Sequence, residues 1–442
     1  MEQQNYPKAG FEAWYMVFIL FLAYTFAAID RQILTLLVEP IKADLSISDS
    51  EMSLLMGFAF AFLFAIAGLP IGRISDRKSR RAVISIGIAC WCLMTAISGF
   101  AKNFWHLFIA RMGVGVGEAS LTPAALSLIS DRFPPNRRAL ALSVFHLGYP
   151  IGAGLAMILG SLIIGWLSEI GDIRLNFLGV FKPWQMTFII VGLPGLLLAV
   201  LMFTFTEPQR HGMLKTEQGD ENLPLSELFI FLRSHWQVYG GHFIGVSLLG
   251  LLAIGTAIWY PTFLMRSYDL SIKEAGMYFG AVNLLFGAPG LIFGGWLAGK
   301  LASKGYLDAN MRIMIIATAT KTLPLVVAPL MPTWQGAIAV TAIATFCGQM
   351  SNGVASATIL DITPNQMRAQ VSSILLLLVN IIGIGFGATF IALLTDFVFA
   401  DDADLRYSIA LASAIVAPLA IIIFALCLKY YRRAVIEAEQ WK

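Results

Sequence analysis

Four charged residues lie inside otherwise apolar stretches of this sequence: Asp30 and Arg31 in one stretch, and Arg111 and Glu118 in another. A charge at the centre of a bilayer-spanning helix costs roughly 3 kcal/mol, so it persists only beside a partner charge, in a water-filled cavity, or as a group that a proton neutralises. A carboxylate that exchanges a proton and an arginine that binds an anion are groups that transport requires. These residues therefore indicate a protein that moves a solute across a membrane.

The spacing of these charges predicts their depth in the bilayer. At a rise of 1.5 Å per residue, Asp30 lies roughly 24 Å above the predicted start of the first span, and Arg111 on the fourth span comes to a similar height. We expect these two residues to pair. Glu118 is seven residues further along, on almost the same face of the helix and about 10 Å deeper, near the middle of the membrane, where no partner is assured. Glu118, and secondarily Asp30, are the predicted proton-coupling residues; the alternative for Glu118 is a static lock with an arginine.

The elements that must position these charges follow from composition. The chain has 442 residues, of which 58% are hydrophobic and 13% are charged. A hydrocarbon core of about 30 Å needs roughly 20 mainly apolar residues per helix. We therefore expect an all-α membrane protein with twelve spans. They are placed near 14–38, 53–72, 82–101, 105–130, 139–166, 184–206, 238–264, 275–299, 311–331, 334–360, 368–395 and 407–428.

A polar stretch with several Pro and Gly residues divides the spans six from six. This predicts an N-terminal bundle over 1–206, a cytoplasmic linker over 207–237 and a C-terminal bundle over 238–442. The pattern Asp131-x-x-Pro134-x-x-x-Arg138 after the fourth span recurs as Asp361-x-x-Pro364-x-x-x-Arg368 after the tenth, which indicates an internal duplication. The two bundles are therefore expected to be pseudo-symmetric.

The segment from Gly72 to Arg81, between the second and third spans, holds one acid among several bases. Such charges at helix ends can form a network that breaks when the helices part. The spacing resembles the signature G-x-x-x-D-R-x-G-R-R of the major facilitator superfamily, with Ser79 where the family usually has glycine. The resemblance implies a gate on the cytoplasmic side, stronger than in the second half, where the echo from Gly295 to Lys300 lacks the acid. The residues expected in the gate are Gly72, Asp76, Arg77, Arg80, Arg81, Asp131 and Arg138.

Within that superfamily two branches compete. The Asp30-Arg31 pair, the spacing from Arg111 to Glu118 and the fifth-span pattern Pro150-x-Gly152-x-Gly154 resemble the spinster family, including its bacterial members. That resemblance implies a proton-coupled carrier of an amphipathic, anionic lipid, of the lysolipid or sphingoid-phosphate type. The anion:cation symporter branch shares the charges but not usually the fifth-span pattern, and would imply transport of hexuronates or similar acids.

The predicted substrate contacts combine cations with apolar surface. Arginines bind phosphate or carboxylate with forked hydrogen bonds, and aromatic side chains suit a hydrocarbon tail. The residues expected to bind substrate are Arg31, Arg111, Tyr149, His146, Phe26, Phe145 and Asn380. For each aromatic residue, simple helix packing is the alternative. Lys321, deep in the ninth span, is either a structural lysine paired with an acid or a residue that reaches a polar cavity.

Other function classes lack their sequence signals. There is no clustering of His, Asp and Cys typical of a catalytic or zinc site, so we expect no enzyme, no metal and no cofactor. The net charge of +3 gives no nucleic-acid signal, because most Lys and Arg residues between the spans fall on the predicted cytoplasmic side. The expected protein is a monomer in the inner (cytoplasmic) membrane, with both termini in the cytoplasm and with protons and a small amphiphile as its partners.

Overall fold

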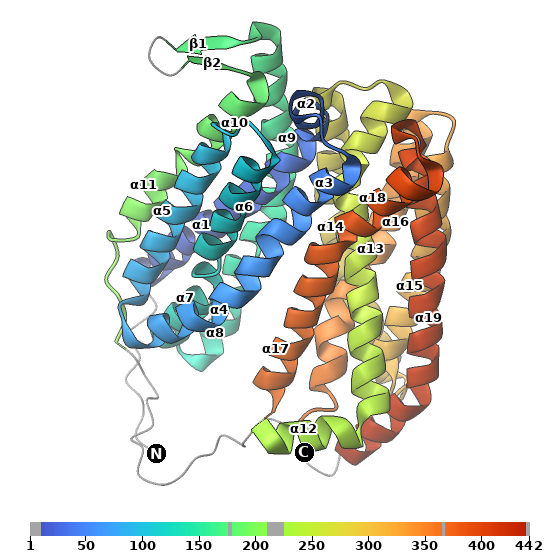
Figure 1. The fold of residues 1–442 in the computed structure, drawn as a ribbon. Coiled ribbons are helices and arrows are strands. Elements are labelled where there is room, and N and C mark those ends of the chain that lie inside the picture. The colour runs from blue at the N-terminus through green and yellow to red at the C-terminus, as the bar shows by residue number, and fades with distance from the viewer. Residues whose placement is uncertain (1–9, 176–178, 210–224, 365–366, 439–442) are drawn as a thin grey trace. The chain divides into compact units, whose positions relative to one another are not determined.

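The computed structural model describes residues 10–175, 179–209, 225–364 and 367–438 (Figure 1). Contacts divide the chain into two compact units. The first comprises Met1–Leu214 with Leu270–Gly280, and the second comprises Lys215–Asp269 with Ala281–Lys442. The short segment Leu270–Gly280 thus groups with the first unit although it follows the seventh span in sequence. The domain boundaries at 206 and 238 stay a prediction.

Twelve helical segments in the described part of the chain are long and apolar enough to span a membrane. They cover 11–36, 49–68, 80–98, 104–132, 140–170, 183–201, 236–268, 272–303, 309–330, 334–360, 370–399 and 402–438. The predicted twelve-span, all-α architecture is confirmed. Several helices continue past the ends that hydropathy suggests, most clearly the last one, because polar residues outside an apolar core remain helical where they pack or cap.

The first unit contains six spans built from shorter helical pieces (Figure 1). Its elements are α1 (Phe11–Leu36), α2 (Val38–Leu45), α3 (Asp49–Ser53), η1 (Leu54–Phe58), α4 (Ala59–Arg77), α5 (Arg80–Ser98), α6 (Phe104–Glu118), α7 (Leu121–Arg132), α8 (Pro135–His146), α9 (Gly148–Ile170), β1 (Ile173–Leu175), β2 (Gly179–Phe181), α10 (Pro183–Gly192) and α11 (Gly195–Leu201). The antiparallel strands β1 and β2 form a small hairpin beyond the end of α9.

The second unit contains longer helices. Its elements are α12 (Leu225–Ser234), α13 (Trp236–Tyr268), α14 (Ile272–Ser303, of which the first residues group with the first unit), α15 (Ala309–Val327), η2 (Ala328–Leu330), α16 (Trp334–Leu360), α17 (Arg368–Val379), η3 (Asn380–Gly385), α18 (Phe386–Leu393), η4 (Leu394–Phe399), η5 (Asp402–Asp404) and α19 (Leu405–Ala438). Buried apolar side chains of α13, α15, α16, α17 and α19 form a shared core.

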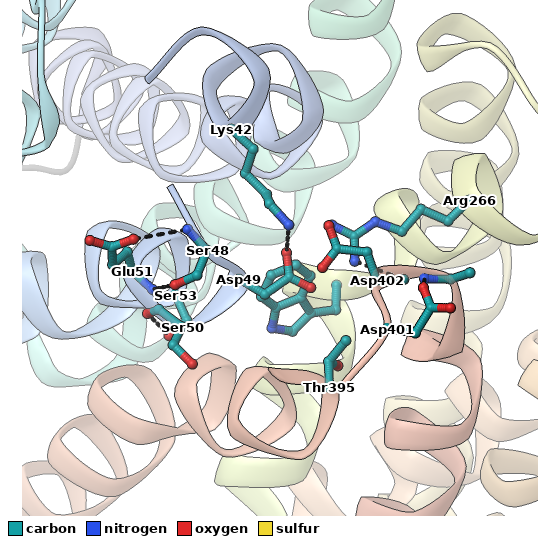
Figure 2. Close-up of polar contacts among 12 residues, drawn as sticks. Lys42, Ser48, Asp49, Ser50, Glu51, Ser53, Arg266, Thr395, Asp401 and Asp402 are labelled. Carbon is teal, nitrogen blue, oxygen red and sulfur yellow. Dashed lines mark hydrogen bonds and ion pairs between the residues drawn. The ribbon is translucent and has the colours of Figure 1, made fainter. Parts of the chain in front are cut away.

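Side-chain caps and one buried ion pair hold the connection between the first two spans (Figure 2). Ser48 and Glu51 form a capping box at the start of α3: the Glu51 backbone N–H donates to Ser48 Oγ at 3.1 Å, and the Ser48 N–H donates to Glu51 Oε2 at 2.9 Å. Lys42 Nζ donates to the fully buried carboxylate of Asp49, which ties α2 to α3. These contacts satisfy backbone groups at a helix end and neutralise a buried charge.

Two glycines let α6 lie against its neighbours at backbone distance. A Cβ added at Gly115 would clash with the backbone carbonyl oxygen of Phe60 on α4. One added at Gly117 would lie 2.7 Å from both the carbonyl oxygen of Gly87 and the backbone nitrogen of Trp91 on α5. Only glycine fits such contacts without a shift of the helices. Helix α6 is therefore held tightly between α4 and α5, which positions Arg111 at its middle and Glu118 at its end.

Candidate functional site

One buried charge contact of the first unit joins Arg31 on α1 to Glu118 on α6. Arg31 Nε donates to Glu118 Oε2 at 2.7 Å, and Nη2 lies 2.5 Å from the same oxygen. The Glu118 side chain is 1% exposed and that of Arg31 is 19% exposed. The sequence assured no partner for Glu118; the structure gives it an arginine, as in the alternative of a lock between helices. Depth along a helix is readable from sequence, but the direction in which Arg31 points across to α6 depends on packing.

Asp30, the neighbour of Arg31, faces the other arginine of α6. Its Oδ1 lies 3.9 Å from Arg111 Nη1, which is an ion pair too long for a hydrogen bond, and accepts a hydrogen bond of 2.6 Å from Thr95 Oγ1. Both charged side chains are almost fully buried. The adjacent residues Asp30 and Arg31 of α1 therefore contact two positions of α6 that are seven residues apart.

Several polar atoms of this charge quartet have no hydrogen-bond partner among the described residues. They are Asp30 Oδ2, Glu118 Oε1, Arg111 Nε and Arg111 Nη1. An unpaired buried polar atom carries a desolvation cost, and such groups in native structures usually mark a ligand, a water or a switching role. The quartet is neutral as two acids and two bases, yet its hydrogen-bonding capacity is only partly used. Such a site keeps acceptor atoms for a proton and donor atoms for an anionic group.

Aromatic rings also pack around the guanidinium group of Arg31. Its guanidinium carbon lies 4.4 Å from the ring centroid of Phe60, 5.3 Å from that of Phe64 and 5.8 Å from that of Tyr149. Tyr149 was expected here, whereas Phe60 and Phe64 were missed. The available signal was their spacing of four residues on one face of a helix, which is as common in cores as in sites.

The other predicted contacts lie around the same helices in different settings. Phe145 is fully buried and stacks on Tyr24 with ring centroids 4.8 Å apart, so in this structure it packs helices and offers no surface to a ligand. His146 is exposed and meets Tyr24 edge-on at 6.2 Å, while Phe26 is partly buried on α1. Asn380 belongs to the second unit, where it begins the π-helical turn η3 and is partly exposed.

A second charge cluster of the first unit centres on Arg80, at the start of α5. This side chain is almost fully buried; it donates to Asp131, to Ser127 Oγ at 2.9 Å and to the Pro208 carbonyl at 2.8 Å. Arg80 Nε lies 3.2 Å from Glu207 Oε1, which also accepts the Arg80 backbone N–H at 2.9 Å. We name Arg80, Asp131 and Glu207 the Arg80 cluster. It links the beginning of the third span to the ends of the fourth and sixth.

Glu207 is the member that sequence reasoning placed in the linker. Burial by itself raises the pKa of this carboxyl, but hydrogen bonds from the Ser79 hydroxyl and from Arg80 outweigh that effect and leave the pKa below its ordinary value. The carboxylate is therefore ionised at neutral pH and completes the charge balance around Arg80.

The remaining gate residues contribute differently. Arg81 donates to the Phe205 carbonyl at 2.8 Å, with its guanidinium 5.3 Å from the Phe203 ring centroid, and Arg77 is exposed. The side chains of Asp76 and Arg138 lie outside the described part of the structure. A Cβ added at Gly72 would meet nothing within 4 Å, so no described neighbouring helix lies against this gate glycine.

Comparison with known proteins identifies the family. The family model described as Major Facilitator Superfamily matches residues 20–388. The chain belongs to the Major Facilitator Superfamily. It is therefore a multi-pass membrane transporter rather than an enzyme, and its twelve spans form two six-helix bundles.

Three similarities refine this placement within the superfamily. A bacterial homolog of the human lysosomal transporter spinster, solved in an inward-facing and unoccupied conformation, superposes with a TM-score of 0.78 and 25% identity over 98% of both chains. Protein spinster homolog 1 of Xenopus laevis is 32% identical over 67% of this chain and 55% of its own length. A probable L-galactonate transporter of Escherichia coli is 27% identical over 80% of this chain and 77% of its own length. The chain thus resembles spinster, as the sequence motifs suggest.

The second bundle of this superfamily member has an acidic residue at the position that corresponds to Asp131 of the Arg80 cluster. Asp361, which repeats the position of Asp131, accepts hydrogen bonds from Asn310 Nδ2 at 2.7 Å and from the Tyr431 hydroxyl at 3.2 Å. The internal duplication thus keeps the acid and replaces its arginine partner by neutral groups.

Arginines in the second bundle bind other acids. Asp308 is almost fully buried between Arg312 Nε at 2.6 Å and Arg432 Nε at 2.5 Å. Burial raises its pKa, and the two guanidinium groups outweigh that effect and hold the pKa below the ordinary value. At another point of the bundle, Arg266 Nη2 lies 3.6 Å from Asp402 Oδ2 (Figure 2).

Lys321 of this transporter is almost fully buried in α15, with only 4% of its surface exposed. Among the described residues no carboxylate lies within ion-pair distance of its ammonium group, so the acid-paired alternative is not observed. Its stem runs beside Gly348 of α16, where an added Cβ would lie 3.6 Å from Lys321 Cδ. The stem of Lys321 therefore packs against this glycine.

Proposed function

We propose that this protein is a proton-coupled secondary active transporter of an anionic amphiphile, of the lysolipid or sphingoid-phosphate type, that works by alternating access. The observation that carries the proposal is the charge quartet of the first unit. Two buried carboxylates face two arginines, and unused acceptor and donor atoms remain on both sides. A site that needed only structural charge balance would use those atoms.

Glu118 is the proposed proton carrier. Because it is buried and bound to Arg31, taking up a proton removes the charge that neutralises Arg31. The released guanidinium can then bind an acidic headgroup through forked hydrogen bonds. Loss of the proton restores the ion pair and displaces the headgroup. Protonation of Glu118 and anion binding are thereby linked, so each favours the other. Asp30 and Arg111 form a neighbouring ion pair.

The lipid-like part of the proposal rests on apolar surface next to the cation. Phe64 and Tyr149 are partly exposed and present rings beside Arg31, which suits a substrate with one charged end and a hydrocarbon chain, whereas Phe60 is buried against the guanidinium. The resemblance to spinster agrees with such a substrate. The second candidate is a hexuronate or a similar sugar acid. It is favoured by the likeness to a probable L-galactonate transporter, and it requires polar contacts around the rest of the ligand.

The Arg80 cluster is proposed to hold the cytoplasmic gate closed, together with Asp76 and Arg138. We further propose that the protein is a monomer in the cytoplasmic membrane with both termini in the cytoplasm. That orientation places the basic segment from Arg77 to Arg81 on the side where Lys and Arg residues concentrate.

Reconstitution into liposomes that contain a pH-sensitive dye tests the function. We expect an oleoyl lysophosphatidate gradient to drive proton movement in the wild-type protein and not in Glu118→Gln, which keeps the side-chain shape but cannot titrate. The matched control is Glu12→Gln, which alters an acid with 74% of its side chain exposed. Proton movement driven by glucuronate but not by the lysolipid favours the sugar-acid candidate. Transport by Glu118→Gln with unchanged pH dependence refutes the proton role.

A further inference from the structure

The two phenylalanines beside Arg31 form a stacked pair on α4. Their ring centroids are 5.3 Å apart, and Phe60 lies closer to the guanidinium carbon than either Phe64 or Tyr149. The face of an aromatic ring attracts a guanidinium group, most strongly where water is excluded. Phe60 is 1% exposed, so this contact is shielded from water. Arg31 is thus held by two kinds of partner, a carboxylate and a set of ring faces.

A π-helical turn directs these rings. The turn η1 immediately precedes α4, and such a turn inserts one residue, which rotates the following residues by roughly 100° relative to an unbroken α-helix. Beyond η1, Phe60 is buried whereas Phe62 is 47% exposed. Gly115 lets the backbone of α6 approach α4 beside these rings. The local distortion and the close packing together bring one face of α4 to Arg31.

The hydrogen bonds of Arg31 leave part of its guanidinium unused. Both contacts to Glu118 go to the single oxygen Oε2, and Arg31 Nη1 has no hydrogen-bond partner in the part of the chain that the structure describes. The titratable groups that interact electrostatically with Arg31 are Glu118 on α6, Tyr149 on α9, and Tyr24 and Asp30 on α1. Helix α4 faces the guanidinium with the rings of Phe60 and Phe64. The attraction of these rings therefore does not change with the protonation of Glu118.

We propose that Phe60 and Phe64 are positioning residues that keep the Arg31 guanidinium in the site when Glu118 becomes protonated, so that it remains available to the acidic group of the substrate. Without the rings, a guanidinium that has lost its counter-ion moves toward water, as long cationic side chains do. The role in substrate binding rests on the proposed function, whereas the contact between the cation and the rings does not.

Fluorinated phenylalanines test the ring electrostatics in the full-length protein. Each added fluorine withdraws electron density from the ring face with little change in shape. We incorporate mono-, di- and trifluorophenylalanine at Phe60 and measure binding of oleoyl lysophosphatidate and, separately, of glucuronate. For the acid that binds, we expect a stepwise loss of affinity that reaches about tenfold, or about 1.4 kcal/mol, in the trifluoro variant. The same series at Phe62, on the exposed face of α4, serves as the control and should be flat.

A second readout separates this inference from the proposed function. The unfolding midpoint of the unliganded protein should fall stepwise in the Phe60 series and not in the Phe62 series, because the contact with Arg31 exists without substrate. A Phe60 series that leaves affinity unchanged overturns the positioning role. If neither acid binds, the proposed function fails, and the unfolding series alone decides whether the rings hold Arg31; a flat unfolding series then overturns the inference.

Discussion

The ion pair between Arg31 and Glu118 predicts strong energetic coupling between two substitutions. In Arg31→Met the buried Glu118 loses its cation, and in Glu118→Gln the arginine loses its anion. Breaking a buried pair from either side costs about 3 to 5 kcal/mol, because an uncompensated charge remains. The double variant removes both charges, so its loss should be far smaller than the sum of the single losses.

The contact geometry sets the size of the coupling. With the charge centres about 4 Å apart and an effective dielectric constant of about 20, the attraction is about 4 kcal/mol. The short contacts of 2.5 and 2.7 Å to one oxygen place the pair at the strong end of the range. We therefore expect a coupling free energy of about 3 kcal/mol. The same cycle on Asp30 and Arg111 should give less, since their nearest N and O atoms are 3.9 Å apart.

The assay is the free energy of unfolding in lipid bicelles, measured by steric trapping for the wild type, the two single variants and the double variant. The control cycle uses Arg132 and Glu12, an ion pair of 2.9 Å at which the Glu12 side chain is 74% exposed. Exposed pairs couple by at most about 1 kcal/mol. Losses at Arg31 and Glu118 that add within about 0.5 kcal/mol would falsify the reasoning, because independent sites add in that way.

Three further predictions concern the Arg80 cluster and Lys321. Glu207→Gln should cost about 2 kcal/mol at neutral pH, as expected for hydrogen bonds to a charged group. Because the folded pKa of Glu207 is depressed, this stability is present above the unfolded pKa of about 4.3 and is lost as the pH falls through the folded pKa. An equal loss in denaturant titrations at pH 7 and at pH 3 contradicts the prediction. Arg80→Lys should destabilise the protein by about 2 to 3 kcal/mol because it loses the hydrogen bonds to Ser127 and to the Pro208 carbonyl. The control Arg77→Lys, at an exposed residue, should change the stability by less than about 0.5 kcal/mol. Equal effects of the two variants on the unfolding free energy count against a central role for Arg80. Lys321→Met should raise the stability by about 2 kcal/mol, since it removes a buried ammonium group that has no acidic partner among the described residues. The control Lys300→Met, near an exposed helix end, should leave the stability unchanged. A destabilised Lys321→Met protein, measured in bicelles, rejects this interpretation.

The number of spans, the presence of intramembrane charges and the internal repeat are readable from residue order alone. A run of about 20 apolar residues has few stable alternatives to a membrane helix, because every backbone polar group must be satisfied inside the segment. The rise per residue likewise places Asp30 and Arg111 at similar depth, and the structure has them facing each other at 3.9 Å. These features depend on one helix at a time.

The choice of partners depends on how helices are rotated against one another, which no single helix encodes. Arg31 turns from α1 to Glu118, while the glycines at 115 and 117 allow α6 to lie close to α4 and α5. The π turn η1 is not apparent in the pattern of apolar residues, yet it directs Phe60 and Phe64 to the guanidinium. Glu207 reads as part of a linker but closes the charge balance around Arg80. In each case the contact joins residues far apart in sequence, and its energy arises only when packing brings their side chains within a few ångströms.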